Sequence, residues 1–113
     1  MDCLFCKIIA GDIPSEKVYE DDLVLAFKDI DPQAPQHIIV SPKKHISSAN
    51  DITADNVEYI SAVWETIPQI AKKLGIAEDG YRVVNNCGQN GGQTVNHIHF
   101  HLMGGRAFLW PAG

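Results

Sequence analysis

Three histidines alternate near the end of the chain, in the stretch His97-Ile98-His99-Phe100-His101. The residues between them are apolar, and this period of two predicts a half-buried strand. All three imidazoles are then expected on one face of the strand, with about 7 Å between neighbours. Histidine titrates near neutral pH and acts as a nucleophile, a proton carrier or a metal ligand. The row therefore indicates a site for chemistry.

The row alone leaves three interpretations open. It could be a solvated face with chance histidines, a catalytic zinc site on the triad, or a nucleophilic imidazole assisted by its neighbours. The preceding loop, Gly91-Gly92-Gln93-Thr94, offers unobstructed backbone N–H groups, an amide and a hydroxyl. Such donors suit the oxygens of a phosphate, which favours the interpretation of a nucleophilic imidazole.

Two of the three cysteines form the motif Cys3-Leu4-Phe5-Cys6. In a reducing compartment this spacing favours a metal site over a disulfide. A redox pair would normally follow a strand and open a helix, whereas this motif stands almost at the chain start. Cys87 has no partner by spacing, and we expect it to behave as a small apolar residue.

The size and composition predict one domain spanning residues 1–113, because no repeat or linker interrupts the 113 residues. A net charge of -5 argues against a broad nucleic-acid surface but permits a pocket for one nucleotide. No apolar run approaches the roughly 18 to 20 residues of a membrane span. Residues 1–7 also lack the basic and apolar regions of a secretory signal. We expect a cytoplasmic protein with neither nucleic acid nor membrane as a partner.

The pattern of apolar residues and chain breakers predicts two helices. A short helix is expected over Leu4–Ala10, ended by Gly11, and a long amphipathic helix over Ala54–Leu74. Asp51 or Thr53 is the expected N-cap of the long helix, and Gly75 its stop signal. Pro68 is expected to kink it.

Five strands are predicted, over Val18–Glu20, Val24–Lys28, His37–Ser41, Tyr81–Asn86 and Val95–Met103. Their order around the long helix predicts an α+β fold with a five-stranded antiparallel sheet. Both helices are expected on one face of the sheet. The other face would then be free for a ligand or a partner subunit.

The sequence resembles the histidine triad family, in particular its branch of small nucleotide-binding proteins that are purine nucleoside phosphoramidases. The shared segments span nearly the whole chain and are Phe5-Cys6-Lys7-Ile8-Ile9, Ile13-Pro14, Ala26-Phe27-Lys28-Asp29-Ile30, Pro32-Gln33-Ala34-Pro35, His37, Pro42-Lys43-Lys44-His45, Gly80-Tyr81-Arg82, Gly91-Gly92-Gln93-Thr94, the triad, Gly104-Gly105-Arg106 and Trp110-Pro111. The resemblance implies a homodimer whose sheet extends across the dimer. It also implies hydrolysis of purine nucleoside 5′-phosphoramidates, such as adenosine 5′-monophosphoramidate, and of related aminoacyl-adenylates, with no cofactor required for catalysis.

The resemblance implies a role for each histidine of the catalytic set. His99 would attack the α-phosphorus and form a nucleotidyl-histidine intermediate, with its second nitrogen donating to the carbonyl of His97. His101 would stabilise the developing charge, and His37 would complete the proton network. Thr94 replaces the serine of most relatives, and its hydroxyl would donate to the phosphate or to the leaving nitrogen.

The resemblance also implies where the substrate lies. Phe5, Ile8 and Phe27 would surround the purine, although periodicity alone makes them core residues. Asp29, otherwise a turn residue, would bind the ribose hydroxyls. The remaining substrate contacts would come from Asn86, Gly92, Gln93, Thr94, His99 and His101.

Some family members bind a structural zinc, and this sequence carries the matching residues Cys3, Cys6, His45 and His97. Two cysteines and two histidines complete a tetrahedral shell without an open position. Two functional alternatives differ from the phosphoramidase. One is a zinc-dependent hydrolase with its metal on the triad, and the other is a non-catalytic nucleotide-binding regulatory module.

Overall fold

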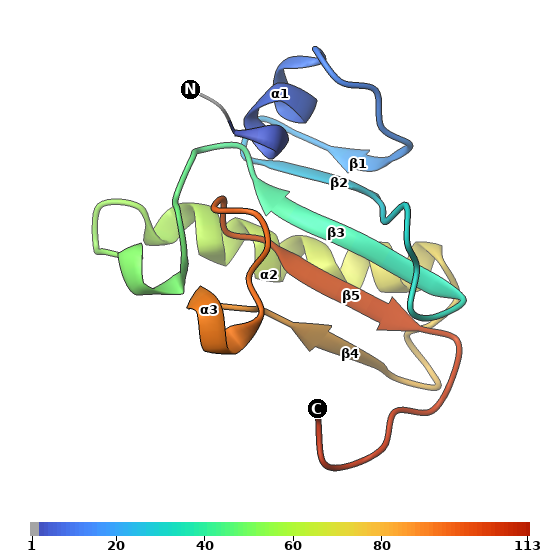
Figure 1. The fold of residues 1–113 in the computed structure, drawn as a ribbon. Coiled ribbons are helices and arrows are strands. Elements are labelled where there is room, and N and C mark those ends of the chain that lie inside the picture. Colours follow the sequence, from blue (N-terminus) through green and yellow to red (C-terminus); the bar gives the residue numbers. More distant parts are fainter. Residues whose placement is uncertain (1–2) are drawn as a thin grey trace.

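A five-stranded antiparallel sheet in the order β1-β2-β3-β5-β4 forms the centre of the computed structural model, which describes residues 3–113. The strands are β1 (Lys17–Glu20), β2 (Val24–Lys28), β3 (Gln36–Pro42), β4 (Tyr81–Val84) and β5 (Phe100–Gly104). The helices are α1 (Leu4–Ala10), the 3-10 turn η1 (Ala49–Asp51), α2 (Val57–Lys73) and the four-residue α3 (Gly88–Gly91). The predicted α+β fold, with one long and one short helix, is confirmed, and α3 is an addition (Figure 1).

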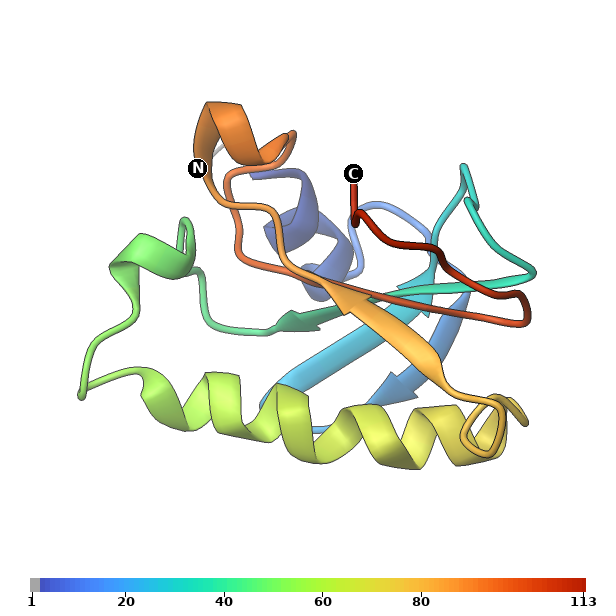
Figure 2. The same cartoon turned by 90° about the horizontal axis from the view of Figure 1, so that it is seen from below.

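The two larger helices lie on opposite faces of the sheet, so the prediction that they share a face is wrong (Figure 2). The alternation along β2 shows the reason. Val24 and Ala26 join the core beneath α2, whereas Leu25 and Phe27 pack with residues of α1. Every residue of β2 except Lys28 is buried, which is the pattern of a strand covered on both sides.

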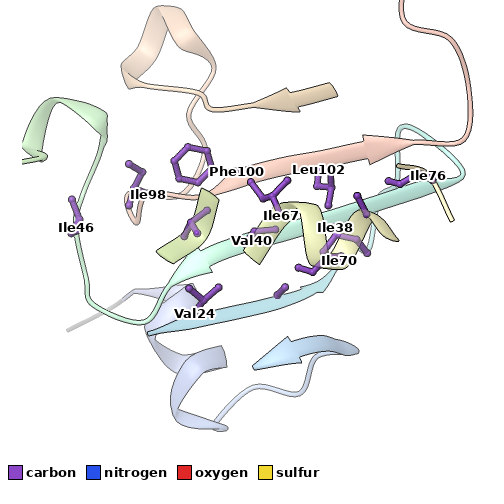
Figure 3. Close-up of a cluster of buried hydrophobic side chains, with 13 residues drawn as sticks. Val24, Ile38, Val40, Ile46, Ile67, Ile70, Ile76, Ile98, Phe100 and Leu102 are labelled. Atoms are coloured by element: carbon purple, nitrogen blue, oxygen red, sulfur yellow. The ribbon is translucent and has the colours of Figure 1, made fainter. Parts of the chain in front are cut away.

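The larger core lies between α2 and the sheet (Figure 3). Ile67 and Ile70 of α2 are buried against Ile38 of β3 and Leu102 of β5. α2 continues through Pro68 to Lys73. The helix begins later than predicted because residues 53 to 56 form a turn of their own, in which the Asn56 side chain accepts the Thr53 N–H. Asn56 is therefore the N-cap, in place of Asp51 or Thr53.

Near the triad, one strand ends earlier than predicted and another begins later. β4 ends at Val84, and β5 begins at Phe100, so His97 and His99 precede the strand. Other bonds replace the β ladder in the segment before β5, because Ile98 N–H donates to the carbonyl of Ile46 and the Ser41 hydroxyl donates to the carbonyl of Ile98.

The triad nevertheless keeps its predicted common face. Ile98, Phe100 and Leu102 all lie in the core beneath α2, so the alternating histidines face the α1 side. Among the helices of residues 3–113, none has both the length and the apolar character to cross a membrane. The prediction about a secretory signal depends partly on residues 1 and 2, which lie outside the described residues.

Candidate active site

His99 presents one open ring nitrogen. Its Nδ1 lies 2.7 Å from the carbonyl oxygen of His97, so Nδ1 carries the proton and donates it, which leaves the lone pair on Nε2. Within residues 3–113 the only buried side-chain nitrogen or oxygen without a partner is Ser15 Oγ, so the unpartnered Nε2 of His99 must reach solvent. Burial lowers the pKa of His99 below 6.5, and the imidazole is therefore neutral at pH 7.

A chain of hydrogen bonds sets the protons on the other two histidines. The N–H of Gln33 donates to Nδ1 of His37 at 3.0 Å, so the proton of a neutral His37 must be on Nε2. That Nε2–H lies 2.8 Å from Nδ1 of His101 and donates to it. The proton of His101 is therefore on its Nε2.

His101 is a neutral donor at physiological pH. Burial, followed by the nearby imidazoles of His99 and His37, lowers the pKa of His101 to about 4. Its ring centroid lies 5.2 Å from that of His99. The site therefore places a ring with a free lone pair beside a ring with a free N–H. This combination suits attack on a phosphorus atom while the charge on its oxygens is stabilised.

An apolar cavity of about 200 Å³ opens next to the histidines. The ring of Phe5 borders it and stands edge-on to two other rings, with centroids 5.5 Å from Phe27 and 4.7 Å from His99. The residues that line the cavity are Leu4, Phe5, Ile8, Ile13, Pro14, Ser15, Glu16, Phe27, Lys28, Asp29, Ile30 and Ile39. Asp29 also connects the cavity to the histidines, because its Oδ2 lies 3.3 Å from Nε2 of His37.

Sequence reasoning missed four large apolar residues of this cavity, which are Leu4, Ile13, Ile30 and Ile39. Ile30 is fully exposed, and Leu4 is 46% exposed. Leu4 could have been found, because it precedes the predicted pocket residue Ile8 by four positions and lies on the same side of the helix. No sequence signal marks Ile30, since it lies outside the periodic segments.

Several hydrogen-bond donors of the glycine-rich loop already donate to carbonyl groups of the protein. The N–H groups of Gly92 and Gln93 donate to carbonyls of α3, and the Gln93 amide donates to the carbonyls of Ser47 and Val95. Contacts of these two residues with a phosphate would have to replace those bonds. Asn86 donates to Gly91 and keeps its side-chain oxygen unbonded within residues 3–113. Thr94 is exposed and borders a second cavity, of about 470 Å³, beside His45.

The four predicted zinc ligands converge at one point. Nδ1 of His97 lies 3.5 Å from each sulfur of Cys3 and Cys6 and 3.2 Å from Nδ1 of His45. A zinc ion with bonds of about 2.0 to 2.3 Å places its tetrahedral ligands about 3.3 to 3.8 Å apart, so this set fits the ion. Nε2 of His97 lies 2.8 Å from the carbonyl of Pro42, which leaves its Nδ1 free to bind a metal.

The Cys6 thiol needs a metal to ionise. Burial and the neighbouring sulfur of Cys3 raise the pKa of Cys6 to about 11, whereas zinc binds the thiolate. All three cysteines are free thiols, and Cys87 lies apart from this cluster.

A second group of metal-type side chains, Asp29, His37 and His101, fits a metal poorly. Nδ1 of His37 already accepts the Gln33 N–H, so Nε2 must keep its proton and has no lone pair for an ion. No metal-type cluster within residues 3–113 includes His99. The arrangement therefore favours imidazole chemistry over a zinc ion held by the triad.

Known proteins are similar to this chain in sequence and in fold. Residues 10–108 match the HIT domain family. The purine nucleoside phosphoramidase of Escherichia coli K12 is 50% identical over 103 residues, which cover 91% of this chain and 87% of that protein. The crystal structure of a HIT family hydrolase from Legionella pneumophila superposes with a TM-score of 0.97 at 48% identity, covering 99% of this chain and 100% of that chain.

A histidine triad protein from Clostridium difficile is also similar, with a TM-score of 0.93, 51% identity and coverage of 96% of this chain and 95% of that chain. The chain belongs to the HIT domain family, as its sequence predicted.

Proposed function

We propose that this chain hydrolyses the P–N bond of purine nucleoside 5′-phosphoramidates through a nucleotidyl-histidine intermediate on His99. That the chain is an enzyme follows from its family and from relatives that are named as hydrolases and as a phosphoramidase. The observation that carries the finer proposal is the single open Nε2 of His99, whose other nitrogen is bonded to the His97 carbonyl.

The reaction proceeds in two displacements. The lone pair of His99 Nε2 forms a bond to the α-phosphorus as the P–N bond breaks. The amine leaves with a proton taken from solvent, and the water that later attacks the phosphorus returns one proton to solvent. The Nε2–H of His101 donates to a phosphate oxygen, and the Thr94 hydroxyl donates to the leaving nitrogen or to the phosphate. Water then attacks the phosphorus, releases the nucleoside monophosphate and restores the neutral imidazole.

The purine occupies the apolar cavity, between α1 and the end of β2. Phe5, Ile8 and Phe27 provide its walls, which leaves the choice between adenine and guanine to finer contacts. Asp29 stands between this cavity and His37, so its carboxylate is placed to accept from the ribose hydroxyls. Phe5 lines the apolar site proposed for the base and also contacts the ring of His99, so the base site lies beside the histidine that carries the open Nε2.

A structural zinc is the second part of the proposal. Cys3, Cys6, His45 and His97 would hold it, and the ion would join the start of α1 to the loop after β3 and to the segment before β5. Bound zinc stabilises the folded chain because the unfolded chain lacks the assembled site. It supplies no step of the reaction.

We also propose a cytoplasmic homodimer. The free thiols suit a reducing compartment. β4 is an edge strand of half-buried residues, and α2 exposes Val57 and Trp64 nearby in the fold, so both provide surface for a second copy. Sedimentation equilibrium measures the mass directly, and a monomeric mass at micromolar concentration would refute this part.

Trapping the intermediate tests the central proposal. The protein is mixed briefly with a slowly cleaved adenosine phosphoramidate, quenched, digested and analysed by mass spectrometry. We expect an added nucleotidyl mass on the peptide that contains residues 97–101, and its loss in His99→Asn. Full turnover by His99→Asn would refute the nucleophile. Turnover by the wild type that ceases on metal removal, with the fold intact and no nucleotidyl adduct on this peptide, would favour the zinc hydrolase. Binding without turnover would favour the regulatory module.

A further inference from the structure

The motif Gly104-Gly105-Arg106 begins at the last residue of β5 and lies outside the cavity and the histidine cluster described above. Its two glycines allow close contacts with two other segments. A Cβ on Gly104 would lie 2.7 Å from Ile76, and a Cβ on Gly105, whose φ is +92°, would lie 2.8 Å from Pro35. The motif therefore packs directly against the loop between β2 and β3, which carries Gln33.

Arg106 binds that loop at one carbonyl. Its Nε and Nη2 lie 3.2 and 3.0 Å from the carbonyl oxygen of Gln33, so two charged donors meet one acceptor. Its Nη1 donates to Ala107, and its guanidinium lies 4.1 Å from the ring centroid of Phe108. The side chain is thus held on several sides, which fixes the position of Gln33.

Oδ2 of Asp29, 3.3 Å from Nε2 of His37, favours the proton of His37 on that nitrogen, and Gln33 favours it from the other side of the ring. The N–H of Gln33 is the donor that keeps Nδ1 of His37 without a proton. If that donor moved away, His37 could carry its proton on Nδ1, and its Nε2 would then accept from Nδ1–H of His101. In this reversed arrangement Nε2 of His101 has no proton and cannot donate to a phosphate.

We propose that Arg106 is a positioning residue which, through Gln33, selects the tautomers of His37 and His101 that leave a donor on His101 Nε2. Its kinetic consequence rests on the proposed function, whereas its effect on the tautomers does not. Asp29 is tied separately to β3, since its N–H donates to the carbonyl of His37. Loss of Arg106 is therefore expected to alter the chemical step more than nucleotide binding.

The test compares Arg106→Met with a matched variant, Arg82→Met. Arg82 also contacts the C-terminal segment, with its Nη2 3.0 Å from the carbonyl of Leu109 and its guanidinium 5.3 Å from the same Phe108 ring. It makes no contact with Gln33. Both variants remove one arginine that contacts the C-terminal segment, and only Arg106→Met removes the link to Gln33.

The tautomers are read by long-range ¹H–¹⁵N NMR of the full-length, ¹⁵N-histidine-labelled protein. We expect Nε2–H on His37 and His101 in the wild type and in Arg82→Met, and mixed tautomers for both in Arg106→Met. We expect kcat for adenosine phosphoramidate to fall about tenfold in Arg106→Met, a fraction of the 10²- to 10⁴-fold that a positioned acid or base contributes. KM should change less than about twofold.

Unchanged tautomers in Arg106→Met, with a kcat equal to that of Arg82→Met, would overturn the inference. If Arg106→Met does not fold, Arg106→Lys, which keeps the charge but not the two donors to Gln33, is judged by the same criteria. A wild type that cleaves no phosphoramidate, together with altered tautomers in the variant, would refute the proposed function and leave this inference standing.

Discussion

The carbonyl oxygen of His97 lies 2.7 Å from Nδ1 of His99, while Nδ1 of the same His97 lies 3.5 Å from the sulfurs of Cys3 and Cys6. One residue thus takes part in two sites. Its side chain belongs to the proposed zinc cluster, and its main chain fixes the proton of the proposed nucleophile. Loss of the metal is therefore expected to affect His99 through the position of one carbonyl group.

Replacement of Cys6 tests the metal site. We expect one zinc per chain in the wild type and less than about 0.1 in Cys6→Ser, because three ligands hold zinc much more weakly than four. Zinc binding should release protons at pH 7, since the pKa of the Cys6 thiol is raised to about 11 without metal. Atomic absorption gives the zinc content, and calorimetry in two buffers gives the protons released. The control is Cys87→Ser, which should keep its zinc, and equal zinc in all three proteins would exclude the assignment.

Acidification is expected to destabilise the metal-free protein between pH 6.5 and about 4. Burial lowers the pKa of His37, His97, His99 and His101 in the folded state, whereas the unfolded chain titrates near 6.5. In this range the unfolded chain binds more protons, so the free energy of unfolding decreases as the pH falls. Urea denaturation at a series of pH values measures the slope.

The slope should become shallower in His101→Asn, because that variant removes the group whose pKa is lowered to about 4. A free energy of unfolding that increases on acidification through this range would contradict the assignment of neutral, buried imidazoles.

A substitution at Ile30 should weaken substrate binding without affecting folding. The side chain of Ile30 is fully exposed, so Ile30→Ser is expected to leave the unfolding temperature within about 1 °C of the wild type. If a purine covers Ile30, the loss of that contact should raise KM about three- to tenfold, from roughly 1 kcal/mol of apolar burial, with kcat nearly constant. Steady-state kinetics with adenosine phosphoramidate measures both constants. Leu109→Ser, at an apolar residue that is 79% exposed in the C-terminal segment, is the control and should keep the wild-type KM.

The hydroxyl of Thr94 is tested by an isosteric change. Thr94→Val keeps the shape of the side chain and removes the donor, so we expect kcat to fall about 100- to 1,000-fold, the range for one lost transition-state donor. Thr94→Ser, which keeps the hydroxyl, should retain activity within about threefold. Equal rates for the valine and serine variants would show that the hydroxyl takes no part in the reaction.

The alternation of apolar residues was sufficient to predict the sheet and the common face of the triad. β2 was predicted with its observed bounds, Val24–Lys28, because its apolar run ends in a charged residue. The same alternation could not show where β5 begins. His97 and Ile98 continue the period of two, but their bonds go to the carbonyls of Pro42 and Ile46 in place of a regular ladder. Those partners depend on how the loop after β3 folds, which is not a local property.

The candidate site, like the fold, could be predicted from the sequence only in part. The zinc ligands could be named because the sequence resembles family members that bind zinc through residues at these positions, and the structure brings all four together. The hydrogen bonds of the Gln93 side chain could not be predicted, because its amide donates to the carbonyl of Ser47, 46 positions earlier in the chain. The opposite positions of α1 and α2 were also missed. A short helix of seven residues contains too few apolar positions to indicate which face of a sheet it covers.

The protonation of the imidazoles in this site depends on the main chain: a carbonyl at Pro42, a carbonyl at His97 and an N–H at Gln33. Every residue type supplies the carbonyl, and every type except proline supplies the N–H. The side chains at positions 33 and 42 could therefore be replaced without moving the protons on the rings of His37 and His97, provided that the backbone keeps its path. The course of the main chain therefore fixes which ring nitrogen of each histidine carries the proton. Substitutions at positions 33 and 42 that preserve this course should leave the protonation unchanged.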